Sequence, residues 1–132
     1  MPVIGFSHVG MTVSSIDRSL AFYVDLLGLK LIDRRPGTRG DEVCFVEAGQ
    51  GCMLELIGPS TGALIAEDVA AGRAGLWHLT FRVDDVDSMA AAVAAAGGEL
   101  VEGPRDAHNR TIARRVVFFR DPDGIIVELL QL

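Results

Sequence analysis

Residues 116–130 read VVFFRDPDGIIVELL, and residues 43–57 read VCFVEAGQGCMLELI, which repeats the pattern 73 positions earlier. In both stretches two apolar runs flank a tight-turn sequence, which is typical of a β-hairpin. A single glutamate interrupts the second run of each copy, Glu128 in one and Glu55 in the other. A charge among buried neighbours costs several kcal/mol unless a partner compensates it, so both glutamates call for a counter-charge.

The repeat extends to the residues before each hairpin. Residues 7–35 align with residues 77–105 without a gap at an offset of 70, which places His8 on His78. Two copies of one unit predict a duplicated module with pseudo-twofold symmetry rather than a long solenoid.

Both copies carry the same order of structural signals. Strands are indicated by β-rich alternation, and helices by Ser or Asp at the N-cap and Gly after the last turn. The strands are expected at 3–13, 29–35, 41–48 and 51–58, then at 76–83, 99–103, 112–120 and 125–131, and the helices at 15–27 and 85–96. Each copy therefore has the order β-α-β-β-β, which predicts an α+β fold.

The length of 132 residues and an apolar content of 49% fit a single domain with a real core. We expect one domain over 1–132, made of module one at 1–58, a connector at 59–75 and module two at 76–132. The connector is rich in small residues and carries a short helical pattern at 64–71.

Composition limits the partners. A net charge of −6, a pI near 4.9 and a single lysine, Lys30, argue against a nucleic-acid surface and favour a small-molecule ligand. No apolar run approaches the roughly 20 residues that span a bilayer, and the first residues lack a signal-peptide pattern. We therefore expect a cytoplasmic protein without a membrane partner.

The alternation of strand residues predicts where the unusual side chains point. Apolar residues take the face toward the helix, so His8 and Glu55 share the opposite face in one copy, and His78 and Glu128 in the other. A lone strand histidine is usually a hydrogen-bonded core residue and a lone glutamate usually faces solvent. Because both recur, we predict that two imidazoles and two carboxylates bind a divalent transition metal.

Other polar residues lie near this predicted site. Arg82, Arg114 and Arg115 are candidates to hold a substrate carboxylate or phosphate, although a solvated arginine is an equal alternative. His108 lies in a loop outside the repeat and is expected at the surface.

Three further residues are expected to be structural. Trp77 directly precedes His78, so in a regular strand it would point to the opposite face. This predicts that Trp77 lies in the core or at a dimer interface. Cys44 and Cys52 both stand in apolar surroundings, which predicts buried thiols rather than a disulfide or a metal pair.

Three segments of the chain resemble the vicinal oxygen chelate superfamily, the group of glyoxalases, bleomycin-resistance proteins and dioxygenases. They are SHVGMTVSSIDRSLAFYVDLLGLKL (7–31), GLWHLTFRVDDVD (75–87) and FFRDPDGIIVELLQ (118–131). The resemblance implies two tandem βαβββ modules that form an open, barrel-like curved sheet with a central metal cavity. It also implies a homodimer, whose cavities are built within one chain or across two.

Carried over by position, the resemblance makes His8, Glu55, His78 and Glu128 the metal ligands. This ligand set is similar to that of glyoxalase I, which implies Ni, Co or Zn as the bound metal, with Fe or Mn as further options. One of Glu128 and Glu55 would double as the catalytic base. The presence of Glu55 at the extra ligand position weighs against an Fe-dependent extradiol dioxygenase.

The resemblance leaves the reaction open. A glyoxalase-I-like lyase and an acyl-CoA epimerase share one step, the metal-stabilised formation of an enolate from a small carbonyl or thioester substrate. The lead-in AGRAGLWH (71–78) is similar to that of methylmalonyl-CoA epimerases, whereas the ligand set is similar to that of glyoxalase I. The alternatives are a dioxygenase and a non-catalytic, bleomycin-resistance-like drug-binding protein.

Overall fold

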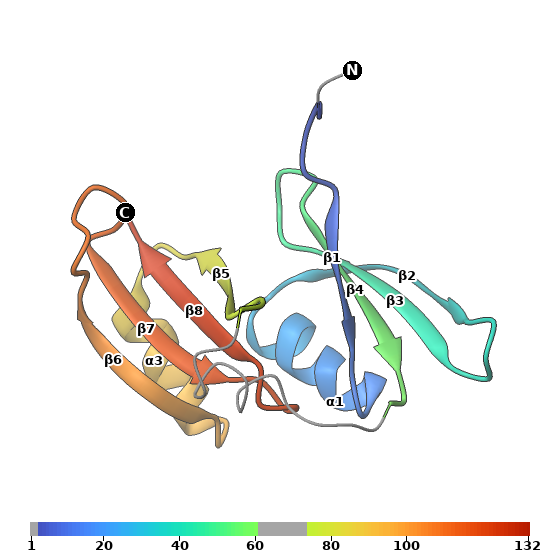
Figure 1. Cartoon of the computed structure of the whole chain (residues 1–132). Coiled ribbons are helices and arrows are strands. Elements are labelled where there is room, and N and C mark those ends of the chain that lie inside the picture. Colours follow the sequence, from blue (N-terminus) through green and yellow to red (C-terminus); the bar gives the residue numbers. More distant parts are fainter. Residues whose placement is uncertain (1–2, 61–73) are drawn as a thin grey trace. The chain divides into compact units, whose positions relative to one another are not determined.

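The computed structural model describes residues 3–60 and 74–132. The chain forms two compact units, Met1–Gly62 and Ala63–Leu132, which we call the N-terminal and the C-terminal unit (Figure 1). The expected connector at 59–75, with its helical pattern, lies mostly outside the described residues, so its boundaries remain a prediction.

The N-terminal unit contains one four-stranded sheet in the order β1-β4-β3-β2. Strand β1 runs parallel to β4, whereas β4 pairs antiparallel with β3, and β3 with β2. The strands are β1 (His8–Thr12), β2 (Lys30–Pro36), β3 (Glu42–Glu47) and β4 (Met53–Gly58).

The C-terminal unit repeats this sheet in the order β5-β8-β7-β6. The strands are β5 (His78–Arg82), β6 (Glu99–Asp106), β7 (Arg115–Arg120) and β8 (Ile126–Gln131). Strand β5 is parallel to β8, and the other two pairs are antiparallel. The predicted α+β fold of two βαβββ modules is confirmed, and each sheet is open because it ends in two edge strands.

Tight turns set the register of both hairpins. Between β3 and β4, Gly49, Gln50 and Gly51 all have positive φ, which glycine adopts without steric cost. Between β7 and β8, the buried carboxylate of Asp121 accepts the backbone N–H groups of Asp123 and Ile125, at 2.8 and 2.9 Å. These turns fix which residue of one strand lies opposite each residue of the next.

One helical segment packs on each sheet (Figure 1). In the first unit, α1 (Ile16–Leu20) continues into the π-helix η1 (Ala21–Leu26), and in the second unit α3 spans Val86–Ala95. The predicted helix at 15–27 has the right extent, but its second half is a π-helix rather than an α-helix. None of the helices in the described residues is long and apolar enough to span a membrane.

The core lies between each helix and its sheet. Leu54 and Leu56 of β4 are buried, as are Val127 and Leu129 of β8. These are the residues whose parity predicted the helix side, so the predicted faces are confirmed. The alternate residues, including both glutamates, occupy the face that the helix does not cover.

The strand expected at 112–120 begins later, at Arg115. The backbone carbonyl of Asn109 accepts hydrogen bonds from the N–H groups of Ile112 and Ala113, at 3.1 and 3.2 Å. The side-chain oxygen of Asn109 accepts a hydrogen bond from the N–H of Thr111. A turn therefore takes the place of the first predicted strand residues.

The prediction of two buried thiols is right for Cys44 and wrong for Cys52. Both are free, but Cys44 is buried and Cys52 is exposed. Cys52 closes the turn before β4, where its N–H donates to Gly49 at 3.0 Å. Burial raises the pKa of the Cys44 thiol, which keeps it protonated and unreactive.

Candidate metal site

The C-terminal unit brings His78 and Glu128 together on neighbouring parallel strands. The pairing of β5 with β8 places Thr80 opposite Glu128, and His78 lies two residues before Thr80 on the same face of β5. Nδ1 of His78 lies 3.6 Å from Oε2 of Glu128, and the two side chains are 25% and 14% exposed. The pair is therefore close and largely shielded from water.

Thr80 stands between these two side chains. Its hydroxyl donates to Oε2 of Glu128 at 2.9 Å and lies 2.9 Å from Nδ1 of His78. Within the described residues, neither Nε2 of His78 nor Oε1 of Glu128 has a hydrogen-bond partner. One nitrogen and one carboxylate oxygen are thus left for a ligand.

The N-terminal unit places His8 and Glu55 in the same register. Strand β1 pairs with β4 so that Gly10 lies opposite Glu55, and His8 is again two residues earlier. Nδ1 of His8 contacts the hydroxyl of its neighbour Ser7 at 2.9 Å. Gly10 occupies the position that Thr80 has in the second copy, so no side chain lies there to hold Glu55.

A phenylalanine contacts the histidine of each pair edge-on. The rings of His8 and Phe45 are 5.5 Å apart, and those of His78 and Phe118 are 5.8 Å apart. The two phenylalanines are equivalent in the repeat, and each lies directly opposite the glutamate of its unit. Each imidazole thus has one phenylalanine ring beside it in the same arrangement.

Trp77 contacts the site instead of the core, so the core prediction is wrong. Its ring is 4.8 Å from that of His78 and is stacked on Phe118 at an interplanar angle of 17°. The residue is 55% exposed. Strand β5 begins only at His78, so the alternation of strand faces does not extend to Trp77. Its predicted alternative, a dimer interface, is not tested.

The apolar neighbours of the C-terminal pair form a small cluster on the same side of the sheet. Phe118 and Ile126 are buried in it, and Leu130 packs against it. An apolar surrounding lowers the local dielectric constant and so strengthens the interaction of the glutamate with a bound cation.

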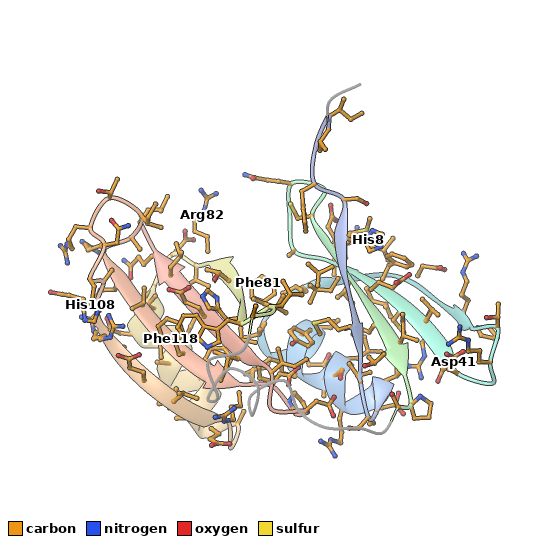
Figure 2. The ribbon with its side chains drawn as sticks, viewed as in Figure 1. His8, Asp41, Phe81, Arg82, His108 and Phe118 are labelled. Carbon is orange, nitrogen blue, oxygen red and sulfur yellow. The ribbon has the colours of Figure 1, made fainter. Side chains whose placement is uncertain are left out.

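Of the arginines predicted to bind substrate, Arg82 has the position most suitable for contact with a substrate. It is exposed, shares the strand face of His78, and its side chain has no ion pair or hydrogen bond within residues 3–60 and 74–132. Figure 2 shows Arg82 extending away from the sheet. Arg114 is also exposed, in the turn before β7. His108 is exposed in the loop after β6, as predicted.

Arg115 has a structural role, so its assignment as a substrate contact is wrong. It pairs with Asp87 of α3 at 2.6 Å and with Asp106 of β6 at 3.1 Å. Hydrogen bonding to Asp87 raises the pKa of the guanidinium. Arg115 has the parity of the buried Val117 and therefore lies on the helix side, where it links the helix to the sheet.

The donor types of both pairs suit a divalent transition metal, since imidazole nitrogen and carboxylate oxygen together match Ni, Co, Zn or Fe. In the described part of each unit, no three His, Cys, Asp or Glu side chains gather into a metal-binding group. The predicted four-ligand set therefore needs one pair from each unit, and it remains a prediction.

Thr80, Phe45 and Phe118 were not predicted as site residues. The parity of β5 had placed Thr80 on the correct face, but its role depends on the register with β8. The repeat was the available signal for the phenylalanines, because an offset of 73 aligns Phe45 with Phe118.

The family model of the Glyoxalase/Bleomycin resistance protein/Dioxygenase superfamily matches residues 5–129. A lactoylglutathione lyase of Neisseria meningitidis is 32% identical over 130 residues, covering 94% of this chain and 88% of that one. A probable lactoylglutathione lyase of Vibrio cholerae is 29% identical over 128 residues, with coverage of 94% and 88%. The solved structure of an antibiotic binding protein from Streptomyces sp. CB03234 matches with a TM-score of 0.74 at 26% identity, covering 99% and 98% of the two chains.

Proposed function

This chain belongs to the glyoxalase/bleomycin resistance protein/dioxygenase superfamily, and from that premise we propose that it is a divalent-metal-dependent lyase of the glyoxalase I type. Its substrate would be a small carbonyl compound. The observation that carries the proposal is the His–Glu pair that recurs in identical register in both sheets. The relatives named as lactoylglutathione lyases favour the lyase over the epimerase.

His8, Glu55, His78 and Glu128 would hold the metal. A bound divalent cation would act as a Lewis acid that stabilises the negative charge on the substrate oxygen when the neighbouring carbon loses its proton. The apolar cluster beside the C-terminal pair would limit the access of water to that charge.

The proton transfer itself belongs to a carboxylate of the chain. Glu128 or Glu55 would accept the proton from the carbon next to the carbonyl and return it to the adjacent carbon. The reaction is then an isomerisation in which no atom is lost and no oxidant is needed. Return of the proton to the same carbon would give an epimerase instead.

The test is turnover of hemithioacetals of 2-oxoaldehydes by protein stripped with a chelator and reloaded with Ni²⁺, Co²⁺ or Zn²⁺. We expect metal-dependent thioester formation, with solvent deuterium incorporated at the carbon that receives the proton. Acyl-CoA thioesters form the second panel, because deuterium exchange into them alone would indicate the epimerase.

Replacement of the base tests the mechanism. At least one of Glu55→Gln and Glu128→Gln should lower kcat by about 10²–10⁴-fold while metal remains bound. The matched control is Glu47→Gln, a carboxylate on β3 outside the pairs. Full turnover by both metal-loaded site variants would exclude the proposed role of these carboxylates.

A second candidate is binding of a flat aromatic drug without turnover. It is favoured by the likeness to the Streptomyces antibiotic binding protein and by the exposed Trp77 stacked on Phe118. Stoichiometric quenching of Trp77 fluorescence by an aromatic antibiotic, in protein that is inactive toward both substrate panels when metal-loaded, would support this candidate over the lyase.

A further inference from the structure

The hydroxyl of Thr80 lies within hydrogen-bond distance of both candidate ligands of the C-terminal unit. The single hydroxyl hydrogen of Thr80 is donated to Oε2 of Glu128, at 2.9 Å. The oxygen of Thr80 then accepts from Nδ1 of His78, also at 2.9 Å. This pattern is the one expected for an imidazole that is protonated at Nδ1 and has the lone pair on Nε2 available.

The fold does not require this hydroxyl. Gly10 occupies the equivalent position in the N-terminal unit, and β1 still pairs with β4 in the same register. The hydroxyl of Thr80 also makes both of its contacts to the two candidate ligands.

We propose that Thr80 is a positioning residue that fixes the tautomer of His78 and the orientation of Glu128 for metal binding. This inference rests on the proposed function for its consequence, because the free Nε2 is assigned to the proposed metal site. The hydrogen-bond pattern is measurable in metal-free protein, independently of that function.

The first arm of the test is NMR of metal-free, ¹⁵N-labelled protein. The chain has three histidines, and the signals of His78 are assigned by comparison with His78→Gln. We expect His78 to be protonated at Nδ1 in the wild type and in Thr80→Ser, and to populate both tautomers in Thr80→Val. The carboxylate of Glu128 cannot replace the hydroxyl without movement, since its Oε2 is 3.6 Å from Nδ1.

The second arm is titration with Ni²⁺, followed by the fluorescence of Trp77, the only tryptophan, whose ring lies 4.8 Å from His78. Loss of a residue that orients metal ligands typically lowers metal affinity by roughly 10–100-fold. We expect this loss for Thr80→Val, and affinity near that of the wild type for Thr80→Ser. Thr12→Val on β1 is the matched control, because the side chain of Thr12 has no hydrogen bond within the described residues.

The outcomes separate this inference from the proposed function. A wild-type His78 protonated at Nε2, or a Thr80→Val variant that keeps both the Nδ1–H tautomer and the wild-type Ni²⁺ affinity, would overturn the role of Thr80. If the wild type bound no Ni²⁺, the metal-dependent function would fail while the NMR arm still decided whether Thr80 fixes the tautomer. Circular dichroism of each variant verifies that the fold is kept.

Discussion

A carboxylate on the uncovered face of a sheet is held only by what its immediate neighbours supply. Thr80 supplies Glu128 with a hydrogen bond, whereas within the described residues Glu55 has none. The two copies of the repeat therefore present the same ligand types with different degrees of preorganisation. Of the two carboxylates, we expect Glu55 to be the one that moves more easily.

Gly10→Ala tests the space around Glu55. A Cβ at position 10 would lie 3.2 Å from Oε1 of Glu55, close enough that the carboxylate has to shift by a few tenths of an ångström. We expect Ni²⁺ affinity to fall several-fold in a titration, with little change in Tm. Gly5→Ala is the control, since nothing lies within 4 Å of its added Cβ. Unchanged affinity in Gly10→Ala would contradict this expectation and would mean that Glu55 takes up the shift without cost to metal binding.

At this scale the sequence predicted residue types and faces better than contacts. Alternation placed His78 and Glu128 on one face because both lie inside regular strands. It failed for Trp77, which precedes its strand, and it could not place Arg115, because residues 116–119 are apolar on both faces of that strand. The bridge made by Thr80 depends on the register between strands 48 residues apart in the chain, which no local pattern specifies.

At the scale of elements, charged residues fasten each helix to its sheet. Asp17 in the first turn of α1 pairs with Arg34 of β2 at 3.0 Å, as Asp87 of α3 pairs with Arg115 of β7 at 2.6 Å. These pairs are largely exposed, so each contributes little to stability by itself. The aspartates are equivalent in the repeat, whereas the arginines come from different strands of the two sheets.

The N-cap of α3 is expected to respond to acid. Asp85 accepts hydrogen bonds from the N–H and hydroxyl of Ser88, at 3.0 and 2.8 Å, and these bonds lower the pKa of its carboxyl below the usual 3.8. The contribution of a carboxyl with a depressed pKa is complete above its unfolded-state pKa and is lost as the pH falls through the folded-state pKa.

We therefore expect Asp85→Ala to lower Tm by a few degrees at pH 7, and this difference from the wild type to shrink below pH about 3.8. The measurement is thermal unfolding followed by circular dichroism between pH 7 and 3. Asp85→Asn keeps an oxygen acceptor for Ser88 and serves as the control, with a smaller loss. A difference that stayed constant down to pH 3 would contradict the assignment.

The order of elements could be predicted from the repeat because both copies carry the same caps, turns and alternation. The exceptions have local physical causes. Residues 112–114 look like the start of a strand, but the hydrogen bonds of Asn109 fold them into a turn. The π-helix at Ala21–Leu26 was not foreseen, since the α and π patterns of apolar residues differ little over so few positions.

At the scale of the whole molecule, each unit offers one imidazole and one carboxylate, too few for a stable transition-metal site. The repeat predicts two such pairs, but it does not specify whether one chain or two chains complete the site, because both arrangements use the same residues. If the proposed four-ligand site forms, either arrangement would hold one metal ion per chain.

The central claim is that both His–Glu pairs contribute to one metal site. Calorimetric titration of chelator-treated protein with Ni²⁺ tests it most directly, applied to the wild type, His8→Gln and His78→Gln. We predict one Ni²⁺ per chain in the wild type, and a loss of affinity in each variant that exceeds the roughly 10–100-fold expected for Thr80→Val. Wild-type affinity in either histidine variant, or two independent Ni²⁺ ions per chain, would contradict the account.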